Sequence, residues 1–109
     1  MDKQQIVERL MSLPGEIATA EEAVIAHNKA VQDAKSTLQA KEDELLTTGF
    51  IDGKNEATRA AQLRSFTGEQ REAVTQAEYR TIRIKNHLSF LYNEFKALQV
   101  VVDLLKGAA

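Results

Sequence analysis

The chain of 109 residues contains two tyrosines, four phenylalanines, no tryptophan and no cysteine, and its formal net charge is −2. The absence of cysteine excludes disulfides, thiolate metal sites and a cysteine nucleophile, and the small negative charge argues against bulk attraction to nucleic acid or anionic lipid. No apolar run approaches the length of a membrane span, and Met1 runs directly into polar residues without the apolar region of a secretory signal peptide.

The first predicted element is a long helix over residues 2–48. Its apolar residues recur at alternating steps of four and three, the heptad pattern of a coiled coil. We call these positions the seam of the first helix. The seam consists of Ile6, Leu10, Leu13, Ile17, Ala20, Val24, His27, Val31, Ala34, Leu38, Lys41 and Leu45.

Pro14 and Gly15 interrupt this helix without shifting the heptad phase. We expect either a kink or a short break, in which Pro14 starts a fresh helix at a tolerated early position. In the second case the Ser12 hydroxyl is placed to cap the new helix.

The segment between the two long patterns predicts a turn and a short helix over residues 55–64. Gly49 is placed to end the first helix in a left-handed cap, and Asp52 with Gly53 supplies a turn in which the glycine is able to take a positive φ. Either Asp52 or Asn55 caps the short helix. Asp52 is expected to form a surface ion pair with Lys54 or Arg59. We expect four apolar side chains to close the end of the seam, namely Phe50, Ile51, Leu63 and Phe66.

A second long helix is predicted over residues 68–106, where Thr67 and Gln70 form a capping-box pattern at its start. Its seam consists of Val74, Ala77, Thr81, Ile84, Leu88, Leu91, Phe95, Leu98, Val102 and Leu105. Because a short connection makes sequential helices neighbours, the prediction is an all-α, antiparallel coiled-coil helical hairpin that forms one domain over residues 1–109.

Both long helices carry apolar residues outside the seam, which a two-helix hairpin does not bury. We expect a second copy of the chain to cover them, giving a dimer that forms a four-helix bundle. The alternative is that the segment before Pro14 folds back over them. The expected oligomer interface consists of Val7, Met11, Ile82, Phe90, Ala97, Val101 and Leu104.

The stretch G-F-I-D-G-K-N-E-A-T-R-A-A-Q-L resembles a motif of small helical proteins encoded by bacteriophages and prophages. There too the motif stands between two long heptad helices, and it has no settled biochemical activity. The resemblance implies a helical hairpin and a phage or prophage origin. We further expect a bacterial cytoplasmic location, and another phage protein or a host protein is the alternative to a second copy as partner. The tip motif in this sequence consists of Asp52, Gly53, Lys54, Asn55 and Arg59, followed by Gln62 and Leu63.

Basic residues concentrate toward the tip, which gives the alternative function of an accessory nucleic-acid-binding protein. The alternative interpretation is that these basic residues belong to an ordinary solvent-exposed helix surface. Glutamates are interleaved with them, and Tyr79 is the only aromatic residue on the helix available for base stacking. The candidate nucleic-acid contacts are Lys54, Arg59, Arg64, Arg80, Arg83 and Lys85.

No pattern in the sequence predicts catalysis, a cofactor or a metal. The tip lacks both the spacing of a phosphate-binding loop and the alternating oxygen ligands of a calcium loop. His27 and His87 lack the further ligands that a metal ion requires. The prediction is therefore a non-catalytic interaction or scaffolding protein.

Overall fold

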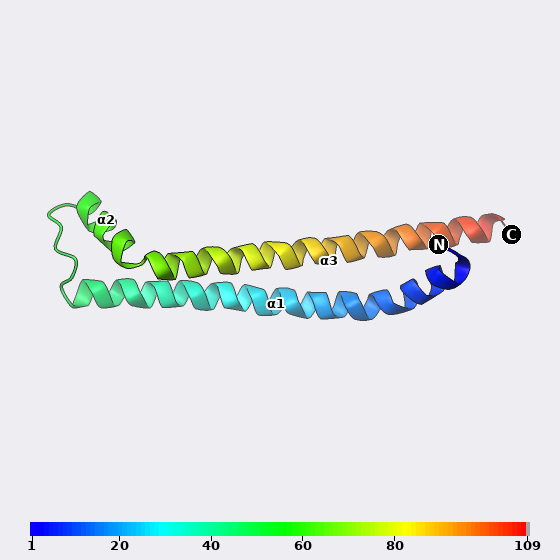
Figure 1. The fold of residues 1–109 in the computed structure, drawn as a ribbon, viewed down its shortest axis with the longest axis horizontal. Helices are drawn as coiled ribbons and strands as arrows, with labels where there is room; N and C mark the ends of the chain where they lie inside the picture. Colours follow the sequence, from blue (N-terminus) through cyan, green and yellow to red (C-terminus); the bar gives the residue numbers. More distant parts are fainter. Residues whose placement is uncertain (109) are drawn as a thin grey trace. The chain divides into compact units, whose positions relative to one another are not determined.

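The computed structural model describes residues 1–108, which form an all-α helical hairpin (Figure 1). Its helices are α1 (Lys3–Thr47), α2 (Glu56–Phe66) and α3 (Gly68–Ala108). The chain divides into two compact units. Unit 1 contains Met1–Ala26 and the chain from Ile82 onward, and unit 2 contains His27–Thr81. Both long helices run through both units, so the division leaves the prediction of a single domain open.

In unit 1 the start of α1 packs against the end of α3, as the blue and orange ribbons show (Figure 1). Leu13 and Leu91 are the most deeply buried side chains there, at 0% and 1% exposed. Ile6, Ala20 and Leu98 complete the buried cluster. Since burying a large aliphatic side chain contributes about 1.5–3 kcal/mol, this cluster accounts for much of the stability of unit 1.

In unit 2 the end of α1 packs against the start of α3, and Val31, Leu45, Val74 and Ala77 are buried. The buried hydroxyl of Thr81 donates to the carbonyl of Ala77 on its own helix, at 2.9 Å, and lies 3.3 Å from the carbonyl of His27 on α1. A polar seam position is thus satisfied by backbone acceptors rather than left unpaired.

The predicted seam is confirmed in both helices. Every seam position is buried or half-buried except Leu105, whose side chain is 42% exposed near the end of α3. The half-buried positions include His27 and Lys41, and the Lys41 ammonium reaches Glu44 at 3.7 Å. Interlocking of these side chains in coiled-coil fashion remains a prediction.

Helix α1 continues through Pro14 without a break, and its blue first turns bend relative to the turns that follow (Figure 1). The alternative of a fresh helix at Pro14 was therefore wrong, as was the Ser12 cap. The Ser12 hydroxyl donates to the Arg9 carbonyl one turn earlier, at 3.0 Å. The segment before Pro14 does not fold back over the apolar residues outside the seam, because it is part of α1.

The helix ends follow local capping rules, with two corrections. Asp2 and Gln5 form a reciprocal capping box at the start of α1, at 2.8 and 2.9 Å. The predicted box of Thr67 and Gln70 was wrong, because the buried Thr67 hydroxyl donates to the Leu63 carbonyl at the end of α2. Helix α3 also continues past Lys106 and Gly107.

Candidate interaction surfaces

The tip motif in unit 2 is held together by its own polar side chains. Asn55 is the cap of α2, since its side-chain oxygen accepts from the Thr58 N–H at 2.8 Å. The Gln62 amide bridges two loop residues, accepting from the Gly53 N–H at 2.8 Å and donating to the Asp52 carboxylate at 2.6 Å. The tip loop is therefore fastened to α2 by side-chain contacts.

Arg59 adds a further contact, in which its guanidinium donates to the Gly53 carbonyl at 3.2 Å. The predicted ion pair between Asp52 and Arg59 or Lys54 was therefore wrong, since Asp52 accepts from Gln62 instead. Lys54 is exposed and forms no hydrogen bond or ion pair within residues 1–108. Of the polar side chains in the tip motif, only that of Lys54 remains available for recognition without breaking a local contact.

The two glycines of the tip have different roles. Gly49 has φ +78°, so the predicted left-handed cap of α1 is confirmed. Gly53 does not adopt the positive φ that a glycine in this turn is able to take. A Cβ at Gly53 would instead lie 2.9 Å from the Arg59 backbone nitrogen and 2.9 Å from the Thr58 methyl group. Gly53 is required because α2 approaches the loop too closely for any side chain.

The apolar residues at the tip do not all close the seam as predicted. Ile51 and Leu63 are half-buried, but Phe50 and Phe66 remain 62% and 50% exposed. These two rings pack edge to face with centroids 6.4 Å apart. The prediction that these two rings plug the bundle end was wrong, because at least half of each side chain is exposed.

The candidate nucleic-acid contacts are spread over both units. Lys54, Arg59, Arg64 and Arg80 lie in unit 2, whereas Arg83 and Lys85 lie in unit 1. Arg59 is engaged by the tip loop. Unit 2 contains eight basic and nine acidic residues, a balance of −1. The basic side chains of unit 2 are thus offset within that unit.

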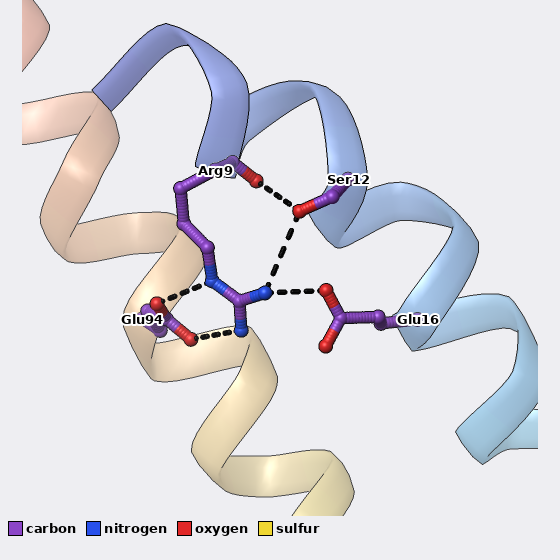
Figure 2. A network of polar contacts seen from close by, with 4 residues as sticks. All are labelled: Arg9, Ser12, Glu16 and Glu94. Atoms are coloured by element: carbon purple, nitrogen blue, oxygen red, sulfur yellow. Dashed lines mark hydrogen bonds and ion pairs between the residues drawn. The ribbon is translucent and has the colours of Figure 1, made fainter. Parts of the chain in front are cut away.

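Unit 1 contains an ion-pair network that connects its two helices (Figure 2). The Arg9 guanidinium donates to both carboxylate oxygens of Glu94 on α3, with Nε and Nη2 each at 2.7 Å. Its Nη1 donates to Glu16 on α1 and lies 3.4 Å from the Ser12 hydroxyl. This bidentate geometry gives directional pairing between the helices. The network was not predicted from the sequence, although charged residues flanking a seam are the usual source of such pairs.

The network shifts the pKa of both partners. Hydrogen bonding from Arg9 lowers the pKa of Glu94 below its ordinary value, although partial burial opposes the shift. The Glu94 carboxylate correspondingly raises the pKa of Arg9, so the guanidinium stays charged. The carboxylate of Glu94 is therefore stabilised in its charged form.

All seven residues of the predicted oligomer interface lie in unit 1. Each is exposed in the single chain, and the large side chains among them range from 37% exposed at Val101 to 78% at Met11. Phe90 is 64% exposed and Leu104 is 69% exposed. Side chains of this size exposed together on one part of a protein indicate a contact with another molecule.

These seven residues do not form one continuous surface. Successive helical residues are about 100° apart, so Val7 and Met11, each two residues from Arg9, point to the opposite side of α1 from Arg9.

By the same rule Phe90, at i−4 from Glu94, points to the side of α3 that carries Glu94. Ala97, Val101 and Leu104 share that side with Phe90, and Ile82 is rotated away. We call the surface of unit 1 that carries Arg9 and Glu94 the network face.

The network face also contains a shallow groove of about 390 Å³. Its α1 wall is made mainly of small residues, and Ile84 and His87 of α3 form the other wall. Nothing would lie within 4 Å of a Cβ added at Gly15, so the groove is open there. The lining residues are Ser12, Gly15, Glu16, Thr19, Ala20, Ala23, Ile84 and His87.

No protein-family model, curated protein or solved structure matches the chain. Within residues 1–108 no group of three or more His, Asp or Glu side chains is arranged to hold a metal ion. Over the same residues, none of the helices combines the length and the apolar character needed to cross a bilayer.

Proposed function

We propose that this chain is a non-catalytic interaction or scaffolding protein of phage or prophage origin that works as a homo-oligomer, with a dimer as its basic form. The network face of unit 1 is the surface through which copies associate. The tip of unit 2 has a structural role, in which its polar side chains fasten the loop to α2. The phage origin rests on the resemblance of the tip motif to those of small phage-encoded helical hairpins.

The supporting observation is the exposure of Phe90, Val101 and Leu104 on a helix whose opposite side is already buried. Leu91 is 1% exposed and its neighbour Phe90 is 64% exposed. A helix that is apolar on two sides is normally covered on both. A two-helix hairpin supplies a cover for one side only, and a second hairpin supplies the other in a four-helix bundle.

The experiment is a measurement of solution mass by light scattering on the native chain and on Phe90→Glu and Val101→Glu. A charge at either position would have to be desolvated in the interface without a partner. We expect the native mass to be near twice 12.1 kDa, and each variant to be monomeric with its helical circular dichroism largely retained.

Tyr79→Glu is the matched control, since Tyr79 is 59% exposed on the same helix but belongs to unit 2. It should keep the native mass. If Phe90→Glu and Val101→Glu both assemble like the native chain, the network face is not the interface.

The alternative of nucleic-acid binding through Lys54, Arg59, Arg64, Arg80, Arg83 and Lys85 stays a prediction, and the structure offers no specific observation in its favour. Nucleic-acid binding is tested by repeating the light-scattering measurement with a short DNA duplex at low and at high salt. A salt-sensitive complex that is abolished by Arg80→Glu with Arg83→Glu would establish the alternative.

A further inference from the structure

We propose that Asp52 and Gly53 form a site of spontaneous aspartyl isomerisation, and that the side chain of Gln62 slows this reaction by holding both reacting groups. The reaction needs no enzyme and changes the backbone of the tip. All three residues belong to unit 2, whereas the network face belongs to unit 1. The proposal therefore holds whether or not the chain forms a dimer.

The chemistry begins with an attack of the backbone on a neighbouring side chain. The Gly53 nitrogen attacks the Cγ atom of the protonated Asp52 carboxyl group and a new N–Cγ bond forms. The carboxyl hydroxyl leaves together with the amide proton as water, and the product is a five-membered succinimide ring. Glycine assists this attack because it has no Cβ to obstruct the approach. Aspartate precedes glycine at this one place in the sequence.

Hydrolysis of the succinimide completes the isomerisation. Asp52 is exposed, so water reaches the ring and adds to one of its two carbonyl groups. Cleavage of the new N–Cγ bond restores aspartate, whereas cleavage of the original peptide bond gives isoaspartate, whose main chain runs through Cβ and Cγ. The water taken up equals the water released, so the mass of the chain is unchanged. The backbone is longer by one carbon atom directly before Gly53, where the loop packs closely against α2.

The fold requires both residues of this reactive pair. A Cβ at position 53 would lie 2.9 Å from the Arg59 backbone nitrogen, so the position requires glycine. The Asp52 carboxylate accepts a hydrogen bond from the Gln62 amide at 2.6 Å, which fastens the loop to α2. Two separate structural requirements thus place an aspartate directly before a glycine.

Gln62 holds the nucleophile and the electrophile at the same time. Its Oε1 accepts from the Gly53 N–H at 2.8 Å, and its Nε2 donates to Oδ1 of Asp52 at 2.6 Å. Only one orientation of the amide satisfies both bonds, because an N–H donates and a carboxylate accepts. The attack requires the Gly53 nitrogen to lose its proton, which breaks the first bond. It also requires the Asp52 carboxylate to be protonated, which weakens the second bond because hydrogen bonds to charged acceptors are the stronger ones.

The other contacts of the tip do not hold the reacting groups. Asp52 forms no ion pair within residues 1–108. The Arg59 guanidinium contacts the Gly53 carbonyl, which takes no part in the reaction. Among residues 1–108, Gln62 is therefore the side chain whose loss frees both reacting groups.

Gln62→Ala removes both bonds and tests this role directly. The native chain and the variant are incubated side by side near neutral pH, and isoaspartate at position 52 is followed by peptide mapping. Electron-transfer fragmentation in the mass spectrometer distinguishes isoaspartate from aspartate of the same mass. We expect isoaspartate to form at least about tenfold faster in Gln62→Ala, because the two hydrogen bonds no longer oppose the attack. A synthetic peptide of residues 49–56 gives the unrestrained rate, which should exceed the native rate by at least the same factor.

Arg59→Ala is the matched control. It also removes a contact between the loop and α2, but it leaves both bonds of Gln62 in place. Its rate should stay within about twofold of the native rate. An equal rise in both variants would show that any loosening of the tip promotes the reaction, and would overturn the role of Gln62.

A second measurement on the native chain does not depend on how well a variant folds. The bond from the Gly53 N–H to Gln62 predicts that this amide hydrogen exchanges with solvent at least about tenfold more slowly than in the peptide, as measured by nuclear magnetic resonance. Exchange or isomerisation at the peptide rate in the native chain would overturn the role of Gln62. A peptide that forms no isoaspartate would overturn the site itself. Slow native rates, with a rise in Gln62→Ala and none in Arg59→Ala, support the proposal.

Discussion

Units 1 and 2 are built on the same heptad seam but differ in what lies outside it. In unit 2 the conspicuous polar residues of the tip bond to one another and to the loop backbone, and Asn55, Arg59 and Gln62 are all engaged. In unit 1 large apolar side chains such as Phe90 point outward beside an open groove. The motif that is most conspicuous in the sequence is thus the more self-contained part of the structure.

The contrast between the two units shows that a conspicuous residue pattern can have either of two physical causes. A pattern whose side chains satisfy one another is explained by local folding. A pattern that leaves several large apolar side chains uncovered along one side of a helix indicates a contact with another molecule. The first account applies to the tip motif and the second to the network face, so loss of a tip contact should lower stability and loss of a network-face contact should lower association.

The largest expected effect is on the shared seam. Leu91→Ala removes a fully buried side chain from unit 1, and we expect the free energy of unfolding to fall by about 2–5 kcal/mol. Urea titration followed by circular dichroism at a fixed protein concentration measures it. Tyr79→Ala, at an exposed site on the same helix, should change the value by less than about 0.5 kcal/mol. Equal losses in both variants would contradict the assignment of Leu91 to the core.

A smaller loss is expected at the tip. Gly53→Ala puts a methyl group 2.9 Å from the Arg59 backbone nitrogen, which is held in α2 and cannot move cheaply. The unfolding free energy should fall by about 1–3 kcal/mol while the solution mass stays native.

Gly68→Ala is the control for this substitution, because Gly68 has open space around its Cα and no positive φ. It should be neutral or slightly stabilising. A Gly53→Ala chain with native stability but altered mass would show that the tip, and not the network face, mediates association.

The smallest effect concerns the ion-pair network. The folded-state pKa of Glu94 lies below its ordinary value of 4.5, so the folded state binds this proton less readily than the unfolded state does. The stabilisation is therefore complete above about pH 4.5 and is lost as pH falls through the folded-state pKa.

Glu94→Gln should be less stable than the native chain near neutral pH, and this difference in stability should disappear under acid conditions. Thermal melts between pH 3 and 7 measure it, and Glu69→Gln is the exposed control. A gap that is independent of pH would contradict the role of the Glu94 charge.

The regular part of the fold was predictable from the sequence because one simple periodicity determines it. The seam positions of both helices and the left-handed Gly49 follow from spacing and residue type alone, and the same signals narrowed the cap of the short helix to Asp52 or Asn55. The effect of Pro14 was harder to predict, because an interior proline either kinks or breaks a helix and the heptad phase is the same in both cases.

The contacts between segments could not be read from the sequence. The bonds of Gln62 to Asp52 and Gly53 depend on how α2 approaches the loop, and the requirement for glycine at position 53 comes from that approach. The pairing of Arg9 with Glu94 depends on the register between α1 and α3. The apolar residues outside the seam were identified from the sequence, but their division between two sides required the position of the Arg9–Glu94 pair.

The most direct test of the central claim is the mass of the native chain by sedimentation equilibrium across a wide concentration range. We predict a mass near twice 12.1 kDa that falls toward the single-chain value on dilution and is lost in Phe90→Glu. A native chain that stays at 12.1 kDa at every concentration would contradict the claim that the network face binds a second copy.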